Sequence, residues 1–399
     1  MGRRQFTVVD LFSGAGGMSC GFARHPGFKI VGAVDVQVGK PSTGHGALQC
    51  NSTYFDNIGV TPLELDLARV APDQLRQALG LSHQKLDVLV ACPPCTGFTR
   101  TIAENHLRDD ARNTLVARTA LYVAAFEPQV FVMENARELL TGKFRGHFEA
   151  LSKALTELGY QMSYDVHMLT DFGLPQQRER AIVMATRGCR PRSISDLWKG
   201  YTIEPKATHV RRAIYDLPWI ESGATSASDP AHTSTLLAGH SLRRIRSIPH
   251  DGGSWKELIG NRSSERYLTP NMWRTIERGR LNQFCDVYGR MSWDRPAPTI
   301  KRESAHPGNG RYSHPEQDRL CTVREMAVLQ GFPNDYRFTS RSRKNAYRNV
   351  GDAVPPLVSF QLAWAVHWAL AGGRRPTPEQ FVLPNTNLSP SDIHLVGSI

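Results

Sequence analysis

Two cysteines separated by two prolines form the most reactive combination of residues in the sequence. The segment Ala91-Cys92-Pro93-Pro94-Cys95 directly follows the apolar run Leu86–Val90. The prolines restrict the backbone and remove two N–H donors, so they hold the next side chain in a fixed direction. Cys95 is therefore a candidate nucleophile, provided that its surroundings favour the thiolate. A redox pair and half of a zinc site are the alternatives, but no second cysteine pair completes a zinc site.

Charged residues that could assist such a nucleophile lie at the ends of two further apolar runs. Glu134 follows Phe131-Val-Met, while Arg178 and Arg180 precede Ala181–Thr186. A carboxylate beside a nucleophilic cysteine can act as a general acid, although a glutamate here can also simply cap the next helix. Two arginines two positions apart in an extended segment point to the same side. They could bind an anion or a carbonyl group, or form one surface salt bridge.

A glycine-rich segment near the start of the chain predicts a site for an adenosine-containing cofactor. It reads Asp10-Leu-Phe-Ser-Gly-Ala-Gly-Gly17 and joins an apolar run to a helix-like stretch. Small residues allow a ligand close to the backbone, and the helix N-terminus supplies free N–H groups. Asp35, 25 positions after Asp10, suits the hydroxyls of a ribose, and Asp66 suits an adenine amino group. A tight structural turn is the alternative, and NAD and S-adenosylmethionine remain unresolved at this point.

The elements that would position these residues alternate between strands and helices. Strands are predicted over 7–12, 29–36, 86–92, 129–134 and 181–186, and helices over 18–25, 72–79, 111–126, 144–158 and 357–370. This alternation predicts an α/β fold with a doubly wound sheet. Ligands bind such sheets beyond the carboxyl ends of the strands, which is where the chemical segments lie.

The composition is that of a folded protein with a polyanionic partner. The 399 residues carry 48 Lys and Arg against 37 Asp and Glu, a net charge of +11. Residues 190–295 hold 17 of these cations and 11 of the acids, so over half of the excess lies in about a quarter of the chain. The seven cysteines are scattered, which indicates a reducing compartment. No signal peptide or membrane span is evident, so we expect a soluble, cytoplasmic, nucleoid-associated protein.

A change in composition near Cys189 divides the chain. We predict a catalytic domain over residues 1–188 that is completed by 346–371, a second domain over 189–345 and a flexible tail over 372–399. The second region is rich in Pro, Ser, Gly, Arg and Trp and has weak helical periodicity, whereas regular helical spacing returns near Asn349. The tail is rich in Pro, Asn and Ser, which predicts a loosely held segment.

Taken in order, these segments resemble those of the DNA cytosine-5 methyltransferases of bacterial and phage type. The C-terminal half adds Arg295-Pro-Ala-Pro-Thr299, His314-Pro315, Arg324-Glu325, Leu329-Gln-Gly-Phe-Pro333 and Gly351-Asp-Ala-Val-Pro-Pro356. The resemblance spans about residues 6–370. It implies a Rossmann-like, S-adenosylmethionine-dependent methyltransferase sheet with a smaller target-recognition domain. It also implies that residues 351–370 return to pack beside the cofactor site.

The resemblance further implies a role for each residue of the site. Cys95 would add to C6 of a cytosine flipped out of duplex DNA, and Glu134 would bind N3. Arg178 would contact the cytosine carbonyl, with Arg180 as its catalytic neighbour. The resulting enamine would take the methyl group of S-adenosylmethionine at C5. The residues implied to hold this cofactor are Phe12, Gly14, Gly16, Gly17, Asp35, Asp66, Pro94, Asp352 and Val354.

Basic residues of the second domain are candidates for DNA contacts, most of them to phosphates. They surround the segment Ile248-Pro-His-Asp-Gly-Gly-Ser-Trp255 and comprise Arg243, Arg244, Arg246, Lys256 and Arg262. The chain departs from the family pattern at Thr96, where glutamine is usual, and at Asp352, where asparagine is usual. Thr96 bears on loop closure and base flipping, and Asp352 adds negative charge near the cofactor.

Three other functions are compatible with parts of the sequence. A tRNA-methylating relative shares these segments but lacks a long recognition segment, whereas about 110 residues separate Arg180 from Arg295. The presence of Cys95, Glu134 and Arg178 disfavours a weakly active or non-catalytic DNA-binding homologue. A Rossmann oxidoreductase would bind NAD in place of S-adenosylmethionine. We therefore expect a monomer that methylates double-stranded DNA without a metal, with a cognate restriction endonuclease as a candidate separate partner.

Overall fold

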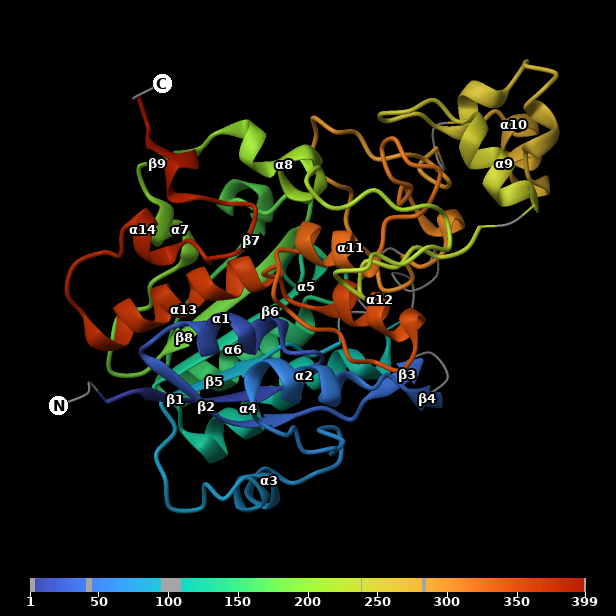
Figure 1. The fold of residues 1–399 in the computed structure, drawn as a ribbon. Coiled ribbons are helices and arrows are strands. Elements are labelled where there is room, and N and C mark those ends of the chain that lie inside the picture. Colours follow the sequence, from blue (N-terminus) through green and yellow to red (C-terminus); the bar gives the residue numbers. More distant parts are fainter. Residues whose placement is uncertain (1–3, 41–44, 95–108, 238, 282–284, 398–399) are drawn as a thin grey trace.

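A computed structural model describes residues 4–40, 45–94, 109–237, 239–281 and 285–397 of the chain. The strands of its central sheet are β1 (Phe6–Leu11), β2 (Phe28–Val34), β5 (Val88–Ala91), β6 (Val130–Ala136), β7 (Gln161–Met168) and β8 (Glu179–Thr186). Their order across the sheet is β2-β1-β5-β6-β8-β7 (Figure 1). β2, β1, β5 and β6 run parallel, whereas β8 runs antiparallel to β6 and β7. The predicted α/β fold is thus confirmed, with one reversed strand near its edge.

Helices cover both faces of the sheet because successive strand residues point to opposite sides. Val8 faces one helical layer and Val9, the next residue, faces the other. The first layer comprises α1 (Gly17–Arg24) and α13 (Pro356–Ala371), and the second comprises α4 (Thr114–Phe126) and α6 (Gly146–Glu157). α13 is apolar around most of its circumference and packs along α1 (Figure 1). This packing brings the C-terminal part of the chain to the glycine-rich segment.

β7 is absent from the strands predicted from the sequence. It lies at the edge of the sheet and has β8 as its neighbour. Tyr164 and Asp165 in its middle are exposed. An edge strand with a solvated face needs no continuous apolar run, so the pattern that reveals buried strands is missing here.

The remaining elements lie around this body. The short strands are β3 (Val38–Lys40), β4 (His45–Ala47), β9 (Tyr201–Ile203) and β10 (Ile393–Leu395). The other helices are α2 (Cys50–Ile58), α3 (Pro72–Ala78), α5 (Glu138–Thr141), α7 (Ile194–Trp198), α8 (Val210–Ile214), α9 (Gly239–Ser247), α10 (Pro270–Glu277), α11 (Val323–Leu329), α12 (Arg343–Asp352) and α14 (Pro378–Phe381). Among the described residues, no helix is both long and apolar enough to cross a membrane.

Residues 239–281, which we call the helical lobe, form a small unit around α9 and α10. Trp255 and Met272 lie at the centre of its own apolar core, and the lobe projects away from the sheet (Figure 1). In contrast, α8, α11 and α12 share a different core with Cys20 of α1. The region between Cys189 and α12 therefore contains one part that is continuous with the sheet body and one part with a core of its own.

The C-terminal residues differ from the flexible tail expected over 372–399. β10 pairs antiparallel with β9, and α14 packs against α13. Leu388 is 4% exposed, and its side chain fills the space beside Gly173. The apolar residues of this segment are isolated between polar ones, so their burial against distant parts of the chain leaves no local periodic pattern.

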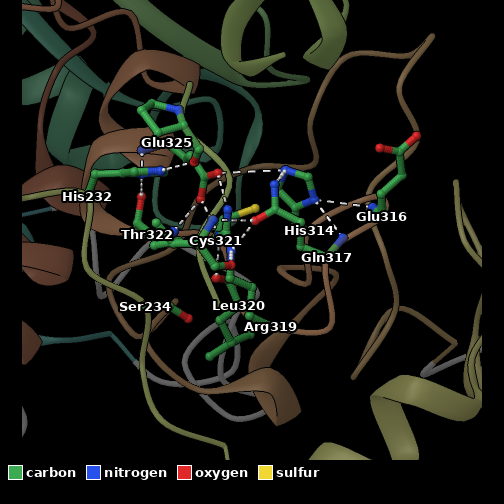
Figure 2. A network of polar contacts seen from close by, with 12 residues as sticks. His232, Ser234, His314, Glu316, Gln317, Arg319, Leu320, Cys321, Thr322 and Glu325 are labelled. Carbon is green, nitrogen blue, oxygen red and sulfur yellow. Dashed lines mark hydrogen bonds and ion pairs between the residues drawn. The ribbon is translucent and has the colours of Figure 1, made fainter. Parts of the chain in front are cut away.

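A buried group of polar side chains fixes α11 against the segments around it (Figure 2). Arg319 donates hydrogen bonds of 2.8 Å to both carboxylate oxygens of Glu325, and the two side chains are 0% and 1% exposed. The N–H of Thr322 also donates to Glu325, and the Thr322 hydroxyl contacts a ring nitrogen of His232 at 2.9 Å. Burial alone would raise the pKa of Glu325, but Arg319 and its other partners hold it at about 2. Glu325 is therefore a charged partner of Arg319 at neutral pH.

Replacing Glu325 by leucine should destabilise the protein strongly, because Arg319 would stay buried without its negative partner. We expect a loss of about 3–5 kcal/mol in the free energy of unfolding, measured by urea denaturation. The double variant Arg319→Met, Glu325→Leu removes both charges and should lose less. Equal losses in the single and double variants would contradict this explanation of the pair.

Candidate active site and nucleic-acid interface

The antiparallel pairing of β6 and β8 brings two charged segments together. β6 ends just after Glu134, and β8 begins with Glu179-Arg180. In the register of the two strands, Glu134 lies opposite Ile182, and Ala136 lies opposite Arg180. Residues two apart along a strand share a face, so Glu134 and Arg180 are diagonal neighbours on one side of the sheet. The end of one strand and the start of the other thus form one edge of the site.

Glu134 and Arg180 form a nearly buried ion pair at this edge. Glu134 Oε1 lies 2.8 Å from Arg180 Nε, and the two side chains are 11% and 14% exposed. The N–H is not aligned with Oε1, and this oxygen accepts no hydrogen bond from the described residues. A buried carboxylate oxygen without a donor is costly. The arrangement therefore suits a ligand that presents an N–H group to Glu134.

The residue after Glu134 anchors the proline segment. Asn135 Nδ2 donates a 2.9 Å hydrogen bond to the carbonyl of Pro93, and Asn135 Oδ1 accepts one of 2.9 Å from the next N–H. β5 lies between β1 and β6, so the segment that follows it leaves the sheet between the glycine-rich turn and Glu134. Cys95 and Thr96 lie outside the described residues. The anchored Pro93 stands two positions before Cys95, and Pro94 between them is half-buried.

Arg178 has surroundings that differ from those of Arg180. It is 3% exposed and lies just before β8 begins. Its guanidinium donates to the carbonyls of Ile300, Gly351 and Ala353, at distances of 3.2–3.4 Å. These contacts tie the start of β8 to the C-terminal segments. The structure thus separates the two arginines, because Arg178 is engaged by backbone oxygens and Arg180 stands beside Glu134.

The glycine-rich segment turns sharply after β1 and borders open space. Phe12 and Gly14 adopt φ values of 62° and 51°, and a positive φ at phenylalanine is a strained conformation that is common at ligand sites. Apart from Gly14 and its two chain neighbours, no described residue has an atom within 4 Å of the position that a Cβ on Gly14 would take. Asp35 accepts hydrogen bonds from the N–H of Gly14 at 2.9 Å and from that of Gln37 at 2.6 Å. Asp35 thus holds the turn beside that space.

Gly16 and Gly17, both expected to contact the cofactor, allow other parts of the protein to approach. A Cβ on Gly17 would lie 2.3 Å from the carbonyl oxygen of Val354, and one on Gly16 would lie 2.8 Å from the Tyr336 hydroxyl. Neither position has room for a side chain. Their absence of side chains lets the N-terminus of α1 meet the C-terminal segment that contains Val354.

Two buried polar atoms beside the turn are available to a ligand. Asp10 Oδ1 and Ser13 Oγ have no hydrogen-bond partner among the described residues. The other carboxylate oxygen of Asp10 accepts a 2.6 Å hydrogen bond from Ser19, and burial raises the pKa of Asp10 to about 7. Orphaned buried polar atoms beside open space fit a ligand that carries hydroxyl or amino groups. The turn therefore suits an adenosine-containing cofactor.

The other acids expected at the cofactor are placed differently. Asp66 is 42% exposed and accepts a hydrogen bond from the N–H of Ala68, while Asp352 forms an ion pair with Arg302. Within the described ranges, no group of three or more His, Cys, Asp or Glu side chains could hold a metal ion.

The basic residues predicted to contact DNA are exposed to different degrees. Arg243 and Arg262 are exposed, and Lys256 is half-buried. Arg246 lies 3.6 Å from Asp318 with 58% of its side chain exposed. These four cations lie on the surface of the helical lobe, where they remain candidates for phosphate contacts.

Arg244, the fifth basic residue predicted to contact DNA, is buried. It is 5% exposed, its Nε donates to the carbonyl of Tyr267 at 2.5 Å, and its guanidinium lies 4.4 Å from the centre of the Tyr288 ring. Burial lowers the pKa of Arg244 from its ordinary value. In contrast to the expectation from the sequence, Arg244 supports the lobe and does not face a polyanion.

The outer face of α10 carries residues that sequence reasoning missed. Met272 points into the core of the helical lobe, so Trp273, Arg274 and Arg278 lie on the solvent side of the helix. Trp273 is 39% exposed. Arg278 caps the C-terminus of α10, and its N–H donates to the carbonyl of Arg274, so the two arginines lie one turn apart. The apolar spacing of Met272 and Ile276 is the sequence signal that could have revealed this face.

Comparison with known proteins gives consistent matches over most of the chain. The sequence model of a family described as C-5 cytosine-specific DNA methylase matches residues 6–368. Type II methylase M.HgiDII of Herpetosiphon aurantiacus is 31% identical over 92% of this chain and 96% of its own length. Type II methyltransferase M.XorII of Xanthomonas oryzae pv. oryzae is 29% identical over 98% of this chain and 89% of its length. A solved E. coli prophage protein described as a DNA modification methyltransferase has a TM-score of 0.57 at 21% identity, covering 92% of this chain and 100% of that chain.

Substituting Gly17 by alanine should separate α1 from the C-terminal segment. The new Cβ would clash with the Val354 carbonyl, so we expect the free energy of unfolding to fall by about 1–3 kcal/mol. Gly146 is a matched control, because it also begins a helix but has open space around its missing Cβ. Gly146→Ala should leave stability unchanged or slightly higher. Equal stabilities of the two variants by urea denaturation would show that the close approach is unimportant.

Proposed function

Since the chain belongs to the C-5 cytosine-specific DNA methylase family, we propose that it methylates C5 of a cytosine in duplex DNA with S-adenosylmethionine as the donor. The observation that carries the proposed mechanism is the pair of Glu134 and Arg180 beside the anchored Pro93. A carboxylate and a guanidinium at one edge suit the N3 and carbonyl groups of a single cytosine ring. Cys95, two positions after Pro93, supplies the nucleophile.

Cytosine C5 is a poor nucleophile, so the ring must be activated before it can be methylated. The thiolate of Cys95 adds to C6, and the electron pair of the C5–C6 bond becomes available at C5. When bound, S-adenosylmethionine supplies an electrophilic methyl group that this carbon takes up. Loss of the C5 proton to solvent then re-forms the C5–C6 double bond and releases the thiolate of Cys95. Because a free thiol of pKa about 8.5 is only slightly ionised at pH 7, the site must favour the thiolate or remove its proton during attack.

The ion pair stabilises the charge that this addition creates. Glu134 donates a hydrogen bond or its proton to N3, because this ring nitrogen carries a lone pair and no proton of its own. The Glu134 oxygen that accepts no hydrogen bond from the described residues is then open to the N–H group of the protonated ring. Arg180 lies 2.8 Å from the same carboxylate and can reach the adjacent carbonyl oxygen, where negative charge develops. Arg178 acts indirectly, because its contacts with Ile300 and Ala353 set the position from which β8 begins.

The glycine-rich turn is the proposed cofactor site. Gly14 borders open space, and the side chain of Phe12 would pack on the adenine ring. Asp10 and Ser13 offer polar atoms that lack partners among the described residues. The remaining residues assigned to the cofactor are Asp35, Asp66, Pro94, Asp352 and Val354. Gly16 and Gly17 shape this site by packing and make no contact with the cofactor in this proposal.

The target base must leave the double helix before Cys95 can reach it. Unstacking costs a few kcal/mol, which contacts with the DNA backbone offset. The helical lobe supplies exposed cations for this purpose, among them Arg243, Arg262, Arg274 and Arg278. We propose that the protein acts on DNA as a monomer in the cytoplasm. Its similarity to Type II methyltransferases supports a cognate restriction endonuclease as a separate partner.

Covalent trapping on DNA that contains 5-fluorocytosine tests the proposed mechanism. Fluorine cannot leave as a proton does, so we expect a protein–DNA adduct that survives denaturing gel electrophoresis in the presence of S-adenosylmethionine. Cys95→Ala should abolish the adduct, while Cys92→Ala, which removes the other thiol of the segment, should retain it. An adduct with Cys95→Ala would mean that another residue is the nucleophile. No adduct with the wild-type protein would refute the proposed function.

The salt dependence of DNA binding tests the role of α10. If Arg274 and Arg278 contact phosphates, replacing both by glutamine should lower the slope of log affinity against log salt by about two. The control is Arg145→Gln, Lys153→Gln, at the N-cap of α6 and within this helix, where both side chains are also exposed. This control should keep the wild-type slope, and equal slopes in all three proteins would exclude α10 from the interface.

A further inference from the structure

Two carboxylates and one guanidinium gather where three segments of the proposed cofactor site meet. Asp35 follows β2, Asp352 ends α12, and Arg302 precedes both α11 and α12 in the chain. We propose that Arg302 is a positioning residue that closes the cofactor site by joining Asp352 to the backbone that follows Asp35. This inference rests on the proposed function, because the site that it closes is the one assigned to S-adenosylmethionine.

The backbone at Arg302 is held against the end of α12. A Cβ on Gly351 would lie 2.5 Å from the carbonyl carbon of Lys301 and 2.6 Å from the backbone nitrogen of Arg302. A real Cβ does not approach backbone atoms this closely, so only glycine permits the contact. Gly351 therefore places the start of the Arg302 side chain beside the next residue of α12, Asp352.

The guanidinium of Arg302 then bridges two segments. Nη1 donates to Asp352 Oδ2, and Nη2 donates to the carbonyls of Val38 and Gly39, at 3.2 Å and 2.6 Å. Val38 and Gly39 belong to β3, which begins three positions after Asp35. Asp35 binds the N–H of the glycine-rich turn at its other end. A continuous series of contacts thus runs from that turn through β3 to α12.

Arg302 also partly neutralises the repulsion between two carboxylates, those of Asp35 and Asp352. The pKa of Asp352 is raised to about 6, because desolvation by the surrounding protein and the charge of Asp35 raise it more than Arg302 lowers it. Burial likewise raises the pKa of Asp35, and Arg302 again opposes the rise. The other charged or titratable groups that face this pair are Arg178, Arg348 and Cys50. Without Arg302, the mutual repulsion of the two carboxylates would be less compensated and would push their segments apart.

This arrangement explains how an acid can occupy position 352 without opening the site. S-adenosylmethionine carries a sulfonium and an ammonium group, so a carboxylate at the site attracts it. The same carboxylate repels Asp35 while the cofactor is absent. Arg302 neutralises that repulsion and at the same time holds β3, so the site keeps its shape before the cofactor binds. Pre-formed sites bind more tightly because less ordering occurs on binding.

A double-mutant cycle on Arg302 and Asp352 tests the proposal. Arg302→Gln, Asp352→Asn and the double variant are purified without ligand and titrated with S-adenosylmethionine in a calorimeter. We expect Arg302→Gln to weaken binding by about tenfold, and the added Asp352→Asn to recover at least about threefold of that loss. Arg24→Gln is the control, because it removes an arginine that pairs with Asp335 at 2.8 Å on the surface. Its affinity should equal that of the wild type.

The stability of the ligand-free protein gives a second readout. The pKa of Asp352 is raised in the folded state, and loss of Arg302 should raise it further. An acid with a raised pKa weakens the folded state as the pH rises through that pKa. The thermal midpoint of Arg302→Gln should therefore fall further below that of the wild type between about pH 5 and pH 8. In the Asp352→Asn background, replacing Arg302 by glutamine should lower the midpoint by an amount that does not change with pH.

The outcomes separate this inference from the function on which it rests. Failure of the wild-type protein to bind S-adenosylmethionine would refute the proposed function. Binding by the wild type together with equal or tighter binding by Arg302→Gln would overturn the role of Arg302. No recovery in the double variant, with a midpoint difference that is independent of pH, would also overturn it.

Discussion

The direction of a single strand determines which charged groups meet at the candidate active site. β8 runs antiparallel to β6, so its first residues lie at the edge where the parallel strands end. A parallel β8 would have carried Arg180 to the opposite edge of the sheet. The reversed strand instead places this arginine 2.8 Å from Glu134, in a setting with little exposure to water. Low exposure strengthens the attraction between the two charges and leaves the carboxylate in need of a further donor.

The C-terminal part of the chain completes the same site from the other side. α13 packs along α1, and the backbone at Val354 reaches α1 where Gly17 has no side chain. Gly351 similarly admits the backbone of Arg302. Both glycines act by leaving room for another segment, and the contact of Gly17 with Val354 joins residues more than 300 positions apart at the proposed cofactor site. Without these tertiary contacts, the turn at Gly14 would lack the C-terminal segment that packs beside it.

The sequence predicts the parallel strands well because each is a short apolar run followed by a polar residue. It also predicts Glu134 and the glycine-rich turn as parts of a site, since both lie directly after such runs. The sequence does not separate the positions of Arg178 and Arg180, because residues two apart in an extended strand point to the same side of it. The structure differs because β8 begins at Glu179, and Arg178 is bound by carbonyls from more than 120 positions later. Arg244 was predicted to contact DNA, and the outer face of α10 was not predicted at all. Both depend on which side chains are buried in the helical lobe, and that burial is set by tertiary packing.

Bisulfite sequencing of DNA from cells that express the protein tests the central claim most directly. If Glu134 and Arg180 activate a cytosine for methylation at C5, the wild-type protein should protect cytosines at one recurring sequence from conversion. A folded Glu134→Gln variant should protect few or none, because it lacks the carboxylate at N3. Full conversion of DNA from cells that contain the folded wild-type protein would contradict the account, as would equal protection by the variant.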